Sequence, residues 1–247
     1  CSSDLGNAFE GWQTQPHGRT VQDFLERALA QIAQEPVKLV CAGRTDTGVH
    51  ASMQVAHFDT AAHRPLEAWV RGVNSHLPAS IGVLWAVEVD ESFHARFSAE
   101  ARRYRYVLLN RRIRPGLAGG RVGWTHGDLD EEAMAAAAAC LAGEHDFTSF
   151  RAAECQAKSP VRLMHSVSVQ RRGEVVVFDF HANAFLHHMI RNLVGSLVFD
   201  RGGRLWIGSP THGVAIWDGQ NLTRFGVEQA LSSLEINALL VDPWDRV

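Results

Sequence analysis

A glycine-containing loop between two strand-type segments constrains the first half of the chain most strongly. Residues 37–42 form a short, mostly apolar run, and residues 54–59 alternate with a period of two. Both patterns are typical of β-strands. The connection between them, residues 43–51, reads Gly-Arg-Thr-Asp-Thr-Gly-Val-His-Ala, which predicts a loop that carries Asp46.

Asp46 has more than one interpretation from the residues alone. An aspartate beside glycines is most often part of a turn. Asp46-Thr47-Gly48 also matches the tripeptide of aspartic proteases, but those enzymes need two such carboxylates and the chain has no second copy, so an obligate homodimer would be required. Arg44 lies two residues earlier, on the same side of an extended backbone, where it would favour an ionised Asp46 suited to nucleophilic chemistry.

Five segments in a fixed order give the chain a family resemblance. The loop at 43–51 resembles the signature of the tRNA pseudouridine synthase A family, and four further segments occur in that family's order. They are residues 9–15, 93–99, 102–106 and 183–195. The matching region covers residues 7–197, about four fifths of the chain.

The resemblance implies a fold and an activity. The fold is α+β, with two similar antiparallel-sheet subdomains and helices that flank a central cleft, here expected as lobes at 1–95 and 96–197. The activity is isomerisation of uridine to pseudouridine in the tRNA anticodon arm, at positions 38 to 40. The family acts as a cytoplasmic homodimer on tRNA, and we expect no cofactor and no metal.

The resemblance also implies roles for single residues. Asp46 would be the catalytic carboxylate, and Arg191 the arginine that pairs with it. Tyr104 would lie over the target uracil, and Arg44 would prop the gap left by the extruded base. Asp46 would either attack C1′ of the ribose or remove a ribose proton to form a glycal, and the sequence leaves both routes open.

Arginines are concentrated in the middle of a chain whose net charge is −3. Between Asp90 and Arg121 there are eight arginines and three acids. Such a cluster is expected where a protein neutralises RNA phosphates, although a solvated basic face balanced by acids elsewhere is an alternative. The expected RNA-binding residues are Arg96, Arg102, Arg103, Arg105 and Arg111.

A predicted strand at 102–109 carries both tyrosines of the chain. A period of two puts Tyr104, Tyr106 and Leu108 on one face. An aromatic ring beside arginines can stack on a base, whereas the ordinary alternative is a half-buried strand tyrosine. We expect the first role for Tyr104 and a core position for Tyr106.

Helices and a hairpin are predicted in the second half. A helix is expected over 128–141 with Asp128 as its N-cap, and a hairpin over 161–182 with its turn at 171–173. Apolar spacing predicts another helix from Ala184 onward. His187 and His188 should point in different directions from it, which argues against a metal site.

Both ends of the chain depart from the family pattern. The family opens with a strand, and we expect the first sheet to lack it because the chain begins at Cys1. Residues 198–247 resemble a propeller repeat of two-component regulators, since Asp200 aligns with Asp242 and residues 214–225 read as a hairpin. This tail would be a fusion or an error in the gene model.

Two alternative functions follow from these departures. The chain could be a catalytically silent RNA-binding protein, or a regulatory protein that acts through the tail. The four cysteines form no Cys-x-x-Cys pair, which suggests reduced thiols of a cytosolic protein, and no signal peptide or membrane span is expected.

Overall fold

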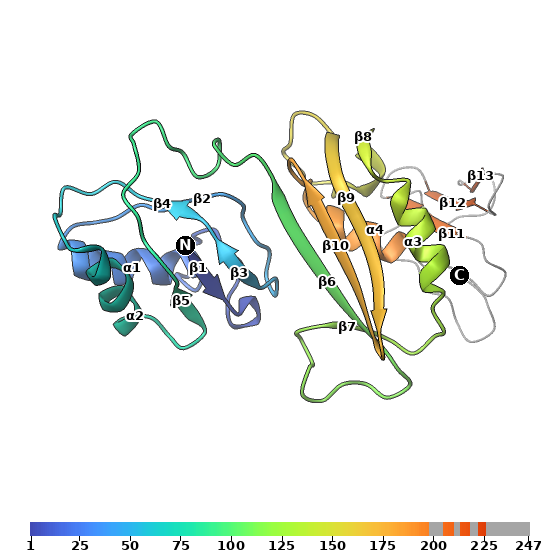
Figure 1. Cartoon of the computed structure of the whole chain (residues 1–247), viewed down its shortest axis with the longest axis horizontal. Coiled ribbons are helices and arrows are strands. Elements are labelled where there is room, and N and C mark those ends of the chain that lie inside the picture. Colours follow the sequence, from blue (N-terminus) through green and yellow to red (C-terminus); the bar gives the residue numbers. More distant parts are fainter. Residues whose placement is uncertain (198–204, 210–212, 218–221, 226–247) are drawn as a thin grey trace. The chain divides into compact units, whose positions relative to one another are not determined.

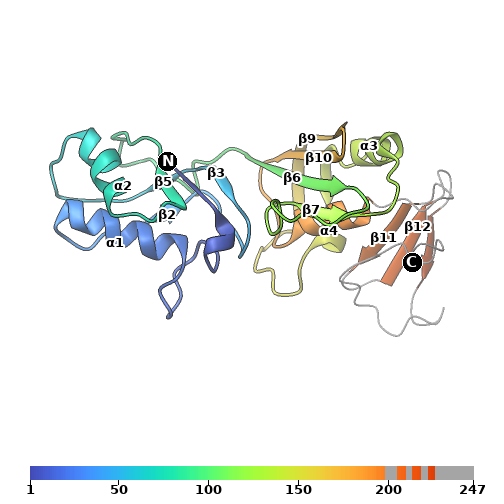
Figure 2. The ribbon, with the colours of Figure 1, turned by 90° about the horizontal axis from the view of Figure 1, so that it is seen from below.

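A computed structural model describes residues 1–197, 205–209, 213–217 and 222–225. The chain divides into two compact units, Cys1–Glu100 and Ala101–Val247 (Figures 1 and 2). Strands and helices are mixed in both units, so the α+β class predicted from the sequence is confirmed. No helix within the described ranges is long and apolar enough to cross a bilayer.

The first unit contains two small antiparallel sheets. One has the order β3-β1-β5 and is formed by Ala51–Gln54, Ser2–Asp4 and Ile81–Val83. The other pairs β2 (Val40–Cys41) with β4 (Ala56–His57). The expectation that the first sheet lacks its opening strand is wrong, because residues 2–4 form the central strand and pair on both sides.

Helix α1 (Val21–Ala33) supplies much of the core of the first unit. Thr20 and Asp23 form a reciprocal capping box that satisfies two backbone N–H groups at its start. Leu25 and Leu29 are buried on its inner face. A π-helical turn (Ala68–Gly72) leads into the short α2 (Val73–Ser75), which packs beside α1 (Figures 1 and 2).

The second unit is built on a five-stranded sheet. Its order is β7-β6-β10-β9-β8, formed by Gly123–Thr125, Arg102–Asn110, Val175–Ala182, Val161–Arg172 and Gly143–Asp146. All neighbours are antiparallel except β6 and β7. The predicted hairpin is confirmed as β9 and β10, which meet at a turn in which Gly173 has a φ of 61°.

Helices α3 (Glu131–Ala139) and α4 (Met189–Ser196) pack on one face of this sheet. Alternate residues of β10, from Val176 to Ala182, are fully buried and share a hydrophobic core with residues of both helices. The N-cap of α3 is Asp130, whose side chain accepts a hydrogen bond from the Ala133 N–H, so the prediction of Asp128 is wrong.

Helix α4 starts later than its apolar spacing predicts. Its N-cap, His188, has a φ of 59° and a ψ of 5°, a left-handed conformation that a helix interior does not allow. The expected start at Ala184 is therefore wrong. His187 lies outside the helix and is not a helical neighbour of Arg191.

A fourth sheet, β11-β12-β13, is formed by Leu205–Ser209, Gly213–Trp217 and Leu222–Phe225. Val214 pairs with Phe225, so the predicted hairpin at 214–225 is confirmed. The residues that suggested a propeller repeat, Asp200 and Asp242, lie outside the described residues.

Candidate active site

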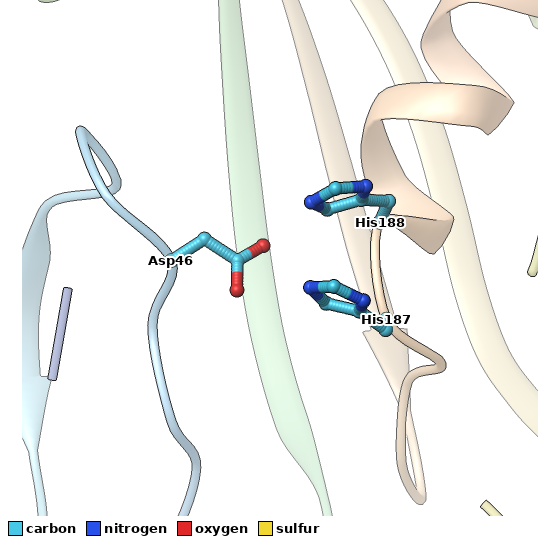
Figure 3. Close-up of side chains that lie close together, drawn as sticks. All are labelled: Asp46, His187 and His188. Carbon is cyan, nitrogen blue, oxygen red and sulfur yellow. The ribbon is translucent and has the colours of Figure 1, made fainter. Parts of the chain in front are cut away.

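Asp46 lies on the loop between β2 and β3, as predicted (Figure 3). Its side chain is half-buried, whereas Arg44 on the same loop is exposed. The Val49 N–H donates a hydrogen bond to the Asp46 carbonyl oxygen at 3.0 Å, which closes a turn directly after the aspartate. The loop thus presents one carboxylate that solvent can reach from a tightly folded backbone.

The N-terminal segment holds this loop through its backbone. The Trp12 N–H donates to the Thr45 carbonyl oxygen at 2.9 Å, and the Gly48 N–H donates to the Gly6 carbonyl oxygen at 3.2 Å. Trp12 is only 1% exposed, so the residue that donates to Thr45, directly before Asp46, belongs to the core. The backbone on both sides of Asp46 is therefore fixed to the preceding segment.

Two glycines make this close approach possible. A Cβ on Gly6 would lie 1.9 Å from the Val49 carbonyl oxygen, which no side chain can occupy. Gly11 has a φ of 81°, and a Cβ there would lie 3.1 Å from the Thr45 carbonyl oxygen. The resemblance included residues 9–15 without giving them a role, and the structure shows that they support the Asp46 loop.

The start of the loop is fixed to the sheets of the first unit. The Ala42 N–H donates to the Val55 carbonyl oxygen at 2.8 Å, and the Gln54 side-chain amide donates to the Gly43 carbonyl oxygen at 2.6 Å. Cys41 ends β2 as a buried free thiol. Burial raises the pKa of the Cys41 thiol to about 11, so this cysteine is no nucleophile at neutral pH.

Tyr104 lies on β6 in the second unit, on the face that the alternation predicted. Its ring meets Phe185 edge to face at a centroid distance of 5.0 Å. Tyr106 packs against the core and contacts Phe178 in the same geometry at 6.3 Å. The two tyrosines share a face of the sheet, but their aromatic contacts differ: Tyr104 contacts Phe185, and Tyr106 contacts Phe178.

Arg191 is exposed on the first turn of α4. Just before this helix, the rings of His187 and His188 lie side by side, with centroids 4.0 Å apart and planes 32° from parallel (Figure 3). The prediction that these side chains point in different directions is wrong. The left-handed backbone of His188 turns the chain so that neighbouring side chains project together.

The five predicted RNA-binding arginines fall into both units. Arg96 belongs to the first unit; in the second unit Arg102, Arg103 and Arg105 lie on β6 and Arg111 comes directly after it. Arg105 makes two hydrogen bonds of 3.0 Å to Asp179, and Arg111 lies 3.4 Å from Glu174. The Arg105 side chain remains 63% exposed, so this ion pair leaves its guanidinium accessible. Arg102 donates to the Asn183 carbonyl oxygen at 2.9 Å, and Arg103 is exposed.

Comparison with known proteins gives a consistent result. The family described as tRNA pseudouridine synthase matches residues 4–98 and 137–212. The curated protein "tRNA pseudouridine synthase A" of Aromatoleum aromaticum is 65% identical over 199 residues, which cover 81% of this chain and 75% of the relative.

Two further relatives carry the same name. The protein of Dechloromonas aromatica is 63% identical over 194 residues, covering 78% of this chain and 74% of the relative. That of Thiobacillus denitrificans is 58% identical over 200 residues, covering 81% and 77%. Because the family match includes the Asp46 loop and most of both units, the chain belongs to the tRNA pseudouridine synthase family.

Proposed function

We propose that this chain isomerises uridine to pseudouridine in tRNA, with Asp46 as the catalytic carboxylate. The observation that carries the proposal is the Asp46 loop, whose backbone is hydrogen-bonded on both sides of a carboxylate that solvent can reach. Relatives named tRNA pseudouridine synthase A match this chain at 58–65% identity over about four fifths of its length. The enzyme class is isomerase, since substrate and product have the same composition.

The chemistry needs only one such carboxylate. The glycosidic bond between C1′ and N1 breaks, the uracil turns while bound, and C5 bonds to C1′. In one route an Asp46 oxygen bonds to C1′ and is displaced when C5 attacks; in the other Asp46 takes a ribose proton and later returns it. In both routes the proton on C5 is lost and N1 gains one, so no oxidant or phosphate donor is consumed.

A uridine inside a stem must first leave its base stack, which costs a few kcal/mol. Arg44, exposed two residues before Asp46, is our candidate for the side chain that fills the gap. Tyr104 would lie over the extruded uracil, with Phe185 holding its ring from the edge. Arg191 would pair with Asp46 and keep the carboxylate ionised.

Binding of tRNA would use the exposed arginines at 96–111. Arg96 and Arg103 are exposed, and the ion pairs of Arg105 and Arg111 are partly open to solvent. Surface ion pairs of this kind contribute little to stability, so a phosphate can replace the carboxylate at small cost. We place the target in the anticodon arm, the enzyme in the cytoplasm and the working form as a homodimer.

Tritium release from a tRNA transcript labelled at uridine C5 tests the proposal, because C5 loses its hydrogen when it bonds to C1′. Wild-type protein should release the label, and Asp46→Asn should release none while still shifting tRNA on a gel. Asp59→Asn, an exposed aspartate of the same unit, is the matched control and should behave as wild type. A wild-type protein that binds tRNA without release would instead be a catalytically silent RNA-binding protein.

A further inference from the structure

Aromatic side chains of the first unit form a contact series that ends at the protein surface. His57 contacts Phe93 at a centroid distance of 6.2 Å and His94 at 4.7 Å. His94 in turn stacks on Phe97, with centroids 4.3 Å apart and planes within 26°. Phe97 is 77% exposed, although the ring behind it is half-buried.

Backbone hydrogen bonds hold the rings behind Phe97 in place. The N–H groups of Arg96 and Phe97 both donate to Nδ1 of His94 at 3.2 Å, and the Ala95 N–H donates to Nδ1 of His57 at 3.1 Å. The Ser98 N–H closes the turn on the His94 carbonyl oxygen at 2.7 Å. The exposed ring therefore rests on a support that is built into the turn.

Positive charge lies beside this ring. The guanidinium carbon of Arg96 lies 5.7 Å from the centroid of Phe97, within the distance at which a cation interacts with an aromatic ring. The turn that carries Phe97 is also connected to the start of the Asp46 loop. The Ala95 N–H donates to His57, and His57 pairs with Val40 of β2, the strand that leads into the loop. The ring and the candidate catalytic loop thus share one region of the first unit.

We propose that the outer face of Phe97 is a stacking site for an unpaired base of the RNA substrate, with Arg96 placed for the neighbouring phosphate. The inference rests on the proposed function, because extrusion of the target uridine leaves a base without its stacking or pairing neighbour. The site differs from the uracil site at Tyr104, which belongs to the second unit.

The chemistry favours RNA as the occupant. A single exposed apolar side chain needs no explanation, but this ring is pre-positioned and lies beside Arg96. Stacking of a base on an aromatic ring is worth about 1 to 3 kcal/mol and tolerates any base, whereas arginine charge attracts phosphate. A protein partner would be expected to cover the ring with apolar side chains instead.

Two substitutions distinguish the effect of the aromatic ring of Phe97 from the effect of side-chain size. Phe97→Leu keeps an apolar side chain but removes the π-face, and Phe97→Trp keeps a stacking surface. We expect Phe97→Leu to raise the KM for tRNA between about 5-fold and 150-fold, with a much smaller change in kcat. Phe97→Trp should stay within about twofold of wild type. Val87→Ala, at an apolar side chain 59% exposed in the same unit, is the control and should leave KM unchanged.

Transcripts with single abasic nucleotides identify the base. For wild type, one abasic position outside the target should raise KM as much as Phe97→Leu does, and the variant should lose nothing further at that position. A Phe97→Leu protein with wild-type KM, or an effect that couples to no position, would overturn the inference.

Sedimentation tests whether a protein partner, rather than RNA, covers the ring of Phe97. If Phe97→Leu changes the oligomeric state, the ring belongs to a protein interface and the stacking inference fails. Filter binding measures the affinity of the variant for tRNA without catalysis. If the wild-type protein releases no tritium, the proposed function is wrong, but filter binding still tests the stacking inference.

Discussion

The main-chain N–H of Trp12 donates a 2.9 Å hydrogen bond to the carbonyl oxygen of Thr45, the residue directly before Asp46. Trp12 is buried in the core of the first unit, so this bond ties the backbone next to the candidate catalytic carboxylate to that core. A shift of about 1 Å in a reacting group can cost a hundredfold in rate, which makes such bonds matter for activity as well as stability.

Gly11 provides the first prediction. An alanine there would have to adopt a φ of 81°, and its Cβ would press on the Thr45 carbonyl oxygen. Gly11→Ala should therefore lower the kcat of tritium release by at least about tenfold, because it displaces the Asp46 loop. Gly18→Ala is the matched control, since Gly18 also has a positive φ, 67°, but an added Cβ there would contact only the side chain of Arg27.

Both glycine variants should lose about 1 kcal/mol or more of stability from backbone strain. If the two variants lose stability alike and keep the same kcat, the role assigned to Gly11 in positioning Asp46 is wrong. Thermal unfolding and single-turnover kinetics on the same samples provide the comparison.

Asp4 provides a prediction on pH. Its carboxylate is buried in the central strand β1 without a hydrogen-bond partner among the described residues, and burial raises its pKa from 3.8 to about 6. The folded state therefore holds the proton more tightly than the unfolded chain. Stability from this group is fully present below pH 3.8 and is lost as the pH rises through about 6.

Asp4→Asn removes this titration. The difference in free energy of unfolding, variant minus wild type, should grow by up to about 3 kcal/mol between pH 4 and pH 7.5. Urea denaturation at both pH values measures it. A difference that does not vary with pH would show that Asp4 titrates as an ordinary surface aspartate.

The N-cap of α3 provides a prediction with a close control. Asp130 accepts the hydrogen bond from the Ala133 N–H, so Asp130→Ala should cost about 0.5 to 2 kcal/mol of stability. Asp128→Ala, two residues earlier, should change stability by less than about 0.5 kcal/mol. Chemical denaturation of the two variants decides between them, and equal losses would contradict the cap.

Arg103 provides a prediction on salt. Its side chain is exposed on β6, and we expect it to neutralise one tRNA phosphate. Arg103→Gln should then reduce the slope of log affinity against log salt by about 0.7 to 0.9. Arg71→Gln, at an exposed arginine of the first unit, should leave the slope unchanged. Equal slopes for Arg103→Gln and wild type would remove Arg103 from the RNA-binding surface.

Periodicity predicted the regular elements because they follow from local preferences. The strand before Asp46 follows from a short apolar run, the β9–β10 hairpin from two strand-type runs around a turn, and the shared face of Tyr104 and Tyr106 from a period of two. The N-cap of α3 was misplaced because Asp128 and Asp130 are equally good caps by sequence. Only the backbone conformation of residue 130 decides which side chain accepts the bond.

Features that depend on tertiary contacts could not be predicted from the sequence. The apolar spacing predicts too early a start for α4 because buried Leu186, which precedes the helix, fits the same spacing. The left-handed conformation of His188 instead makes the helix begin at Met189. The support of the Asp46 loop by Gly6 and Gly11, and the stacking of His94 on Phe97, depend on segments that meet only after folding. No local sequence pattern predicts contacts between distant segments. The glycines near Trp12 were the one sequence feature that indicated a close approach of two backbone segments.

The most direct test of the account is nucleoside analysis of tRNA after incubation with excess enzyme. Digested tRNA should contain pseudouridine with the wild-type protein and with Asp59→Asn, and none above background with Asp46→Asn. Pseudouridine formed by Asp46→Asn at the wild-type rate would contradict the assignment of Asp46 as the catalytic carboxylate.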